Sequence, residues 1–179
     1  MNNSGFSKYS KAAILLHWLI AILVVTNVVL VSMAEGLPRE AKAPYMDPHK
    51  AIGISILALS LFRLLWRLGH KPPPIPGAVP GWQAMLGRTT HALFYFLIIA
   101  VPLTGWLMVS AAPGSPGANF FGLFMLDLPV GDSKQLSGIG YDAHEILTKP
   151  LVILIFLHVA AALKHQFIDR LPFIQRMFP

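Results

Sequence analysis

Histidines recur along the apolar stretch 143–167, where their type and spacing could bind an iron. His144 and His158 are 14 positions apart, and His165 follows seven positions later. In an α-helix, 14 residues bring a side chain back to within about 40° of the first, about 21 Å along the axis. Two imidazoles on one face can therefore each offer a nitrogen to a separate iron. The alternative is that they are packing or interfacial histidines, but ionisable groups inside a membrane are costly and tend to be functional.

Four apolar stretches must position these histidines. They cover about residues 12–34, 49–68, 88–109 and 144–167. About 20 apolar residues cross the hydrocarbon core of a bilayer. The composition, 55% hydrophobic and 12% charged, is too apolar for a soluble domain. Residues 12–34 could also be a signal peptide, but their length favours a membrane span. We therefore predict an all-α integral membrane four-helix bundle that forms one transmembrane domain over residues 1–179.

The charges predict the orientation of the bundle. With four spans, the N-terminal segment, the connector 69–87 and the C-terminal segment share one side. That side carries nine cations: Lys8, Lys11, Arg63, Arg67, Lys71, Arg88, Lys164, Arg170 and Arg176. The other side carries five: Arg39, Lys42, Lys50, Lys134 and Lys149. Since cytoplasmic loops are enriched in Lys and Arg, both termini are expected in the cytoplasm. The net charge of +6 thus reflects topology, and no nucleic-acid partner is expected.

Residue types restrict the cofactor. The chain has no cysteine, which excludes disulfides, thiolate metal sites and covalent haem attachment through C-x-x-C-H. A haem would therefore be held by side-chain ligands alone, as a b-type haem. Metal or proton transport is the competing interpretation, but it calls for carboxylates within the spans. Only Glu145 comes close, and it lies at a helix end.

Histidine depth predicts two layers of cofactor ligands. Near the outer surface, the available pair is His49 with His144. The inner layer offers a choice, and we predict His17 with His158 because both lie one to two turns inside their helix ends. His91 and His165, which lie closer to the inner surface, are the alternative ligands of this layer. Two ligand pairs on different helices could each hold a cofactor inside a four-helix bundle.

Three further residues border the inner layer. Arg63 follows His49 by 14 positions, so it shares that face one layer deeper, and we predict that it binds an inner-haem propionate. A snorkelling interfacial arginine is the alternative. His91 and His165 lie just beyond the inner layer and could form a cytoplasmic quinone site, because imidazole can relay protons near neutral pH. They could equally be interfacial histidines.

Five segments together resemble the bacterial cytochrome b561 family, a group of small di-haem, quinone-linked membrane proteins that include superoxide oxidase. The matching segments are LLHWLIAILVV, DPHKAIGISILALSLFRLLWR, HALFYFLIIAVPLTGWLM, AHEI and LHVAAALKH. The resemblance covers nearly the whole chain and implies a cytochrome b domain with two non-covalent b haems. In that family, histidines of the first, second and fourth helices bind the haems. Carried over, the outer pair is His49 and His144 and the inner pair is His17 and His158.

The resemblance implies a multi-pass electron-transfer protein of the bacterial inner membrane. The expected activity is that of a superoxide:quinone oxidoreductase, which oxidises superoxide at the periplasmic face and reduces ubiquinone. The family also resembles the cytochrome b subunits of dehydrogenases and hydrogenases, so an electron-relay or anchor subunit is the alternative. Both functions use the same haem ligands. The expected partners are membrane lipid, quinone, and either superoxide or a partner redox protein. A structural or transport bundle with incidental histidines is a third interpretation.

Overall fold

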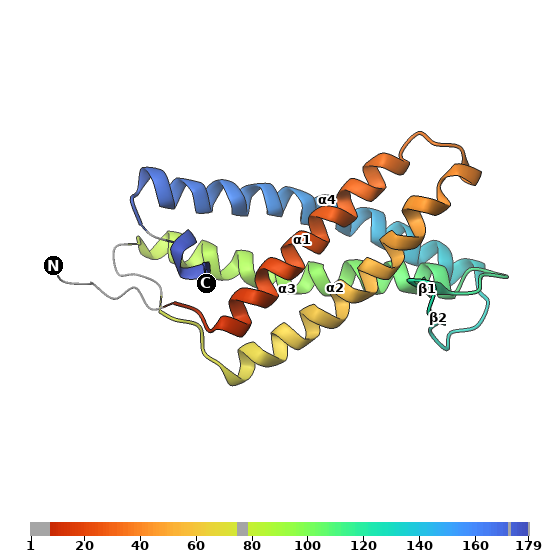
Figure 1. The fold of residues 1–179 in the computed structure, drawn as a ribbon, viewed down its shortest axis with the longest axis horizontal. Coiled ribbons are helices and arrows are strands. Elements are labelled where there is room, and N and C mark those ends of the chain that lie inside the picture. The colour runs from red at the N-terminus through yellow and green to blue at the C-terminus, as the bar shows by residue number, and fades with distance from the viewer. Residues whose placement is uncertain (1–7, 75–78, 172, 179) are drawn as a thin grey trace.

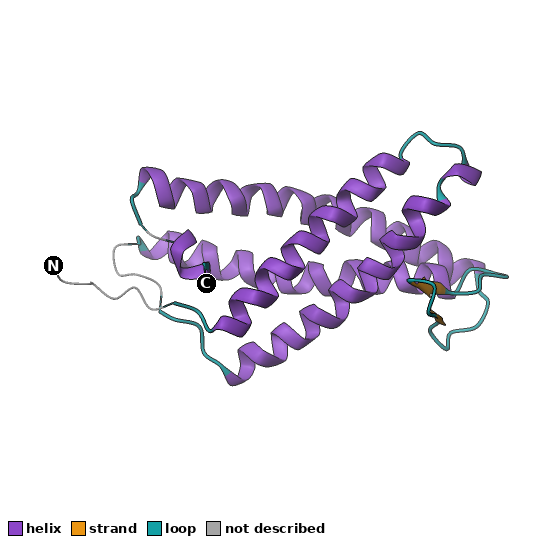
Figure 2. Cartoon of the chain, viewed as in Figure 1, coloured by secondary structure: helices purple, strands orange, loops and turns teal. Residues whose placement is uncertain are grey.

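Four long helices form the protein, as the computed structural model shows (Figures 1 and 2). The structure describes residues 8–74, 79–171 and 173–178. Its helices are α1 (Lys11–Ala34), α2 (Ala43–Gly69), α3 (Gly81–Ser110) and α4 (Lys134–Leu163). Each is long and apolar enough to cross a membrane. Large apolar side chains such as Ile22, Leu65, Phe96 and Phe156 remain exposed on them, as expected for contact with lipid. The predicted four-helix membrane bundle is confirmed.

Shorter elements complete the chain. They are η1 (Arg39–Ala41), β1 (Ala118–Phe120), β2 (Phe124–Leu126), the π-helical turn η2 (Lys164–Ile168) and η3 (Ile174–Met177). Successive long helices run in opposite directions, and the α1–α2 pair crosses the α3–α4 pair (Figure 1). We call the end that holds Tyr9, Pro74 and η3 the terminal end. There the Tyr9 N–H donates to the Arg176 carbonyl at 3.3 Å, and Arg176 Nη2 donates to the Pro74 carbonyl at 2.9 Å.

Close packing joins only some of the helices. Within the described residues, α3 packs on α4, α1 on α2 and α2 on α3, whereas α4 makes at most isolated backbone contacts with α1 and α2. Gly140 allows the α3–α4 approach, because a Cβ there would lie 2.7 Å from the Met108 nitrogen. Ser137 Oγ also donates to the Met108 carbonyl at 2.9 Å. Small residues that let two backbones approach are typical of membrane helix pairs.

The helices extend beyond the predicted spans. The helix α2 begins at Ala43 and not at His49. Pro44 lies in its first turn, where a backbone N–H would have no helical partner and proline is therefore tolerated. The helix α4 begins at Lys134, where the Ser133 hydroxyl accepts from the Leu136 N–H at 3.2 Å. Apolar length marks only the part of a helix that lies in hydrocarbon, so polar turns outside it were missed. Residues 134–142, predicted as connector, are therefore helical.

The opposite end carries a β-hairpin, and we call it the hairpin end. The strands β1 and β2 pair antiparallel, with Asn119 opposite Met125. The turn places Phe121 at φ 52° and Gly122 at φ 77°, and Asn119 Oδ1 accepts from the Gly122 N–H at 2.7 Å. Strand β1 packs against α2 and α3, so the hairpin caps the bundle.

Candidate functional site

The predicted outer pair meets across the bundle. His49 on α2 and His144 on α4 have ring centroids 6.1 Å apart and planes at 86°. A metal–imidazole bond is about 2 Å and the ring radius about 1 Å, so two rings on opposite sides of one iron have centroids about 6 Å apart. The separation of His49 and His144 therefore leaves room for one metal ion between the rings, and these two residues would hold a haem iron.

His144 is held by α3. Its Nδ1 lies 2.8 Å from the Val101 carbonyl oxygen. Because a carbonyl only accepts, Nδ1 carries the proton and Nε2 keeps a lone pair for a metal. The ring lies directly over Gly105, where a Cβ would be 2.9 Å from Nδ1 and 3.0 Å from Cε1. The absence of a side chain at Gly105 thus makes room for the imidazole of His144.

His49 is held less completely. Its Nδ1 is buried and makes no hydrogen bond of good geometry in the described part of the chain, although the Asn27 backbone interacts with this imidazole. The side-chain Oδ1 of Asn27 on α1 is likewise buried without a partner there. The amide of Asn27 faces α2 at Gly53, where a Cβ would lie 3.9 Å from Asn27 Nδ2, one turn beyond His49. Buried polar atoms without partners cost free energy. Such atoms are expected beside a cofactor site, and the residues of the outer layer fit a haem.

Three histidines meet in the inner layer. The ring centroid of His158 on α4 lies 6.3 Å from that of His17 on α1 and 5.9 Å from that of His91 on α3. Both distances are compatible with axial ligation. His17 and His158 are half-buried, whereas His91 is exposed. Phe94 packs its ring edge-on to His158 at 5.3 Å. The structure thus brings the predicted ligands His17 and His158 together and also places the alternative, His91, beside His158.

Arg63 lies beside this inner layer. Its guanidinium interacts electrostatically with His17, His91 and His158, and its Cζ lies 5.9 Å from the centre of the Tyr95 ring. This position is one layer deeper than His49 on the same helix, as the sequence predicted. A half-buried guanidinium at this depth is suitably placed for a propionate carboxylate.

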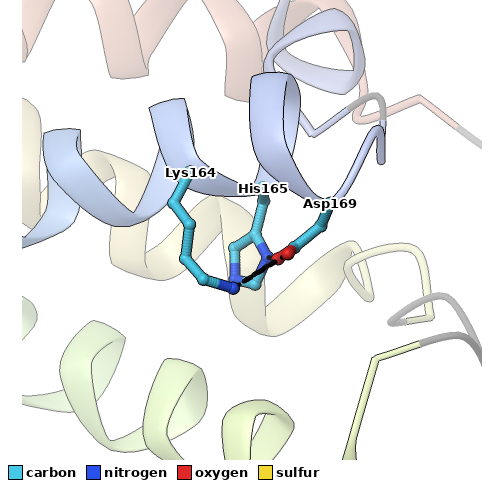
Figure 3. A network of polar contacts seen from close by, with 3 residues as sticks. All are labelled: Lys164, His165 and Asp169. Carbon is cyan, nitrogen blue, oxygen red and sulfur yellow. Dashed lines mark hydrogen bonds and ion pairs between the residues drawn. The ribbon is translucent and has the colours of Figure 1, made fainter.

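His165 belongs to a separate polar network beyond the inner layer (Figure 3). Asp169 Oδ2 lies 2.7 Å from His165 Nδ1 and 2.6 Å from Lys164 Nζ. The hydrogen bond from Lys164, followed by that from His165, holds the pKa of Asp169 below its usual value. His165 also stacks on Phe173 at 4.9 Å. His91 and His165, predicted to share one quinone site, therefore make their contacts with different neighbours.

The histidines of the interior contact one another in pairs. In residues 8–74, 79–171 and 173–178, no three His, Asp or Glu side chains converge as a metal cage. His144 and His158 lie on the same helix, 14 residues and hence about 21 Å apart. The two layers therefore lie toward opposite ends of the bundle.

Comparison with known proteins covers nearly the whole chain. Residues 8–179 match the family described as prokaryotic cytochrome b561. The chain belongs to this family. It is 32% identical to cytochrome b561 homolog 2 of Escherichia coli (strain K12), covering 95% of this chain and 90% of that protein. It is 30% identical to the probable superoxide oxidase CybB of Yersinia pestis, covering 96% of each. It is 25% identical to cytochrome b561 homolog 1 of Escherichia coli (strain K12), covering 97% of this chain and 98% of that protein.

Membership establishes the broad function and location of this cytochrome b561. It is a multi-pass protein of the bacterial inner membrane that transfers electrons through b-type haem. The contacts missed by sequence analysis are those of Val101, Gly105, Asn27 and Asp169. A glycine within a membrane helix signals a close approach, but nothing in the sequence shows that the approaching group is His144.

Proposed function

We propose that this cytochrome b561 oxidises superoxide at its outer, hairpin end and passes the electrons to ubiquinone near the terminal end. Two superoxide ions would lose one electron each, and one ubiquinone would gain both electrons and two protons. The observation that carries the proposal is the pair of histidine contacts at opposite depths, His49 with His144 at 6.1 Å and His17 with His158 at 6.3 Å between ring centroids, distances at which each pair would hold one iron. The relative from Yersinia pestis, printed as a probable superoxide oxidase, supports the choice of donor.

The four histidines would hold two b haems, one in each layer. A haem b with two histidine ligands accepts and releases single electrons and leaves no coordination position open for oxygen. The role of the chain is then to fix the ligand rings and to exclude other ligands. The Val101 carbonyl does this for His144 by holding its Nδ1–H. Arg63 would neutralise a propionate of the inner haem.

Charge at the hairpin end bears on the approach of superoxide. Seven of the eight carboxylates belong to this end, and an anion is repelled by them. Within the described residues, two of these carboxylates form ion pairs: Asp47 with Lys50 at 3.0 Å and Glu145 with Lys149 at 2.9 Å. Both pairs flank the outer histidines, at two positions before His49 and one position after His144. Lys50 and Lys149 would therefore offset the negative field where superoxide has to arrive.

Protons for ubiquinone would come from the terminal end. His165 keeps Nε2 available because its Nδ1 faces Asp169, and imidazole can relay a proton to a neighbouring oxygen. His91, exposed beside His158, would lie closer to the inner haem edge. We propose that these two histidines serve quinone reduction at successive positions on a proton path, rather than as two walls of one pocket.

Rapid mixing tests the proposal. The purified protein, oxidised and without a partner, is mixed with superoxide while the haem absorption bands are followed, and ubiquinone is then added. Fast haem reduction followed by reoxidation by ubiquinone is expected. Bands that superoxide leaves oxidised, while a chemical reductant reduces them, would contradict the superoxide oxidase assignment.

The acidic hairpin end favours a second function, an electron-relay or anchor subunit for a partner dehydrogenase or hydrogenase. Carboxylates such as Asp127 and Asp132 in the outer connector could pair with a basic partner surface. In that case superoxide would reduce the haems slowly, whereas the reduced partner would do so rapidly.

A further inference from the structure

A basic cavity opens at the terminal end, and its wall includes Arg63 but none of the histidines of the two layers. Its volume is about 320 Å³, and it lies between α1, α2, α3 and the connector that follows α2. Its walls include the cations Lys8, Arg63, Arg67 and Lys71 and the aromatic residues Trp66 and Tyr95. None of the described residues that line it is an Asp or a Glu. We call it the basic terminal pocket.

Two guanidinium groups share one aromatic ring in this pocket. The Cζ atoms of Arg63 and Arg67 lie 5.9 and 5.6 Å from the centre of the Tyr95 ring. Both side chains are half-buried, and the ion pairs found in the described part of the chain involve neither of them. Like charges held together without carboxylates create a strong positive potential. The inner-haem propionate proposed for Arg63 would relieve part of it, and a second anion would be needed to match Arg67.

The surroundings indicate which anion fits. On α2, the helix that supplies Arg63 and Arg67, the neighbouring side chains Phe62, Leu65 and Leu68 are 53%, 66% and 76% exposed. By helix periodicity they lie on the side of α2 that faces away from the pocket lining and toward lipid. Since α2 is long and apolar enough to cross a membrane, lipid headgroups surround this end of the helix, and a ligand drawn from them has an anionic head and hydrocarbon chains. Ubiquinone has an uncharged head and would leave the cations unmatched.

We propose that the basic terminal pocket binds the phosphate group of an anionic phospholipid from the surrounding bilayer. Basic pockets between membrane helices bind acidic lipid headgroups in this way. Arg67 and Lys71 supply the phosphate contacts, while Arg63 faces the inner histidines. The Trp66 indole, held by Ser10 Oγ at 3.1 Å, forms a rigid wall of the pocket. The inference is independent of the electron donor and of the quinone site.

Lipid-dependent stability of the haem-loaded protein provides the test. Wild-type protein is placed in nanodiscs of phosphatidylcholine alone or with added phosphatidylglycerol, and thermal loss of the haem band is recorded. Phosphatidylglycerol should raise Tm, and native mass spectrometry of detergent-purified protein should show a retained phosphatidylglycerol. The double variant Arg67→Gln/Lys71→Gln should bind this lipid about 30-fold more weakly, because each cation near the surface contributes about a factor of five. Arg88→Gln, an exposed cation of the same end outside the pocket, should behave as wild type.

Several results would overturn the inference. One is an equal Tm in both lipid mixtures, and another is a double variant that keeps the lipid. Inorganic phosphate that reproduces the Tm rise in phosphatidylcholine would show that the pocket takes a free phosphate. Loss of haem from the double variant would assign these cations to the propionates. If the double variant does not fold, the single variant Lys71→Gln, in the exposed connector, gives the same comparison with a smaller expected loss of affinity for phosphatidylglycerol.

Discussion

Replacing Gly105 by alanine should displace His144 and release the outer haem that we propose. The new Cβ would lie 2.9 Å from Nδ1 and 3.0 Å from Cε1 of the imidazole. Non-bonded carbon contacts are comfortable at about 3.5–4.0 Å. The ring would therefore have to move by about 0.5–1 Å. A helix backbone packed against α4 cannot easily move instead, because Gly140 already brings the two helices together.

This displacement is large on the scale of the site. Metal–ligand distances tolerate only about 0.2 Å, and the hydrogen bond from His144 Nδ1 to the Val101 carbonyl, 2.8 Å long, would be broken or badly distorted. Loss of such a supporting contact typically weakens metal binding by about 10–100-fold. Gly105→Ala should therefore retain the inner haem and lose most of the outer one during purification.

The assay is a pyridine haemochrome measurement of haem per chain, combined with a redox titration. Gly138→Ala is the matched control, because a Cβ at Gly138 on α4 meets nothing within 4 Å. It should retain both haems. A Gly105→Ala protein with two haems per chain and unchanged potentials would refute the reasoning that Gly105 makes room for a coordinating His144.

Three further predictions concern the other residues of the two layers. His49→Ala should remove the outer haem and His17→Ala the inner one, as seen in haem content and in the remaining redox transition, whereas His91→Ala should keep both haems. Arg63→Gln should weaken retention of the inner haem by about tenfold or more, because a charge-assisted hydrogen bond contributes about 1.5–3 kcal/mol. His165→Ala and His91→Ala should each accept electrons normally but slow haem reoxidation by added ubiquinone, as measured by stopped-flow absorption.

Each of these predictions has a result that contradicts it. Loss of the inner haem from His91→Ala, with retention in His17→Ala, would make His91 the partner of His158. Unchanged haem content and potential in Arg63→Gln would remove the propionate role. Wild-type reoxidation rates in both quinone variants, with haem content intact, would move quinone reduction away from the terminal end.

Much of the architecture follows from the sequence alone, because it depends on local properties. Apolar length and the scarcity of charge determine that the chain crosses the membrane four times. The 14-residue interval between His144 and His158 determines that α4 carries two histidines on one face at two depths, since helix geometry is constant. The same periodicity brings Arg63 one layer deeper than His49. These predictions do not require knowledge of which helix lies beside which.

The helix ends and the hairpin were less predictable. Hydropathy reports where a helix lies in hydrocarbon, so the polar first turns of α2 and α4 were missed. The hairpin depends on a left-handed backbone conformation at Phe121 and on the hydrogen bond from the Gly122 N–H to Asn119 Oδ1. Neither feature gives a strong sequence signal in an apolar segment.

Only the tertiary structure decided which side chains meet. The sequence left His17, His91 and His165 open for the inner layer with His158, and the structure places His17 and His91 beside His158, with His17 the more buried. The contact of His144 with Val101 and Gly105 depends on how far α4 is rotated about its axis and how closely it approaches α3. Those two quantities are set by packing at Gly140 and Met108, between segments about 30 residues apart. Residue spacing along one helix cannot determine them, because rotation and approach are properties of a pair of helices.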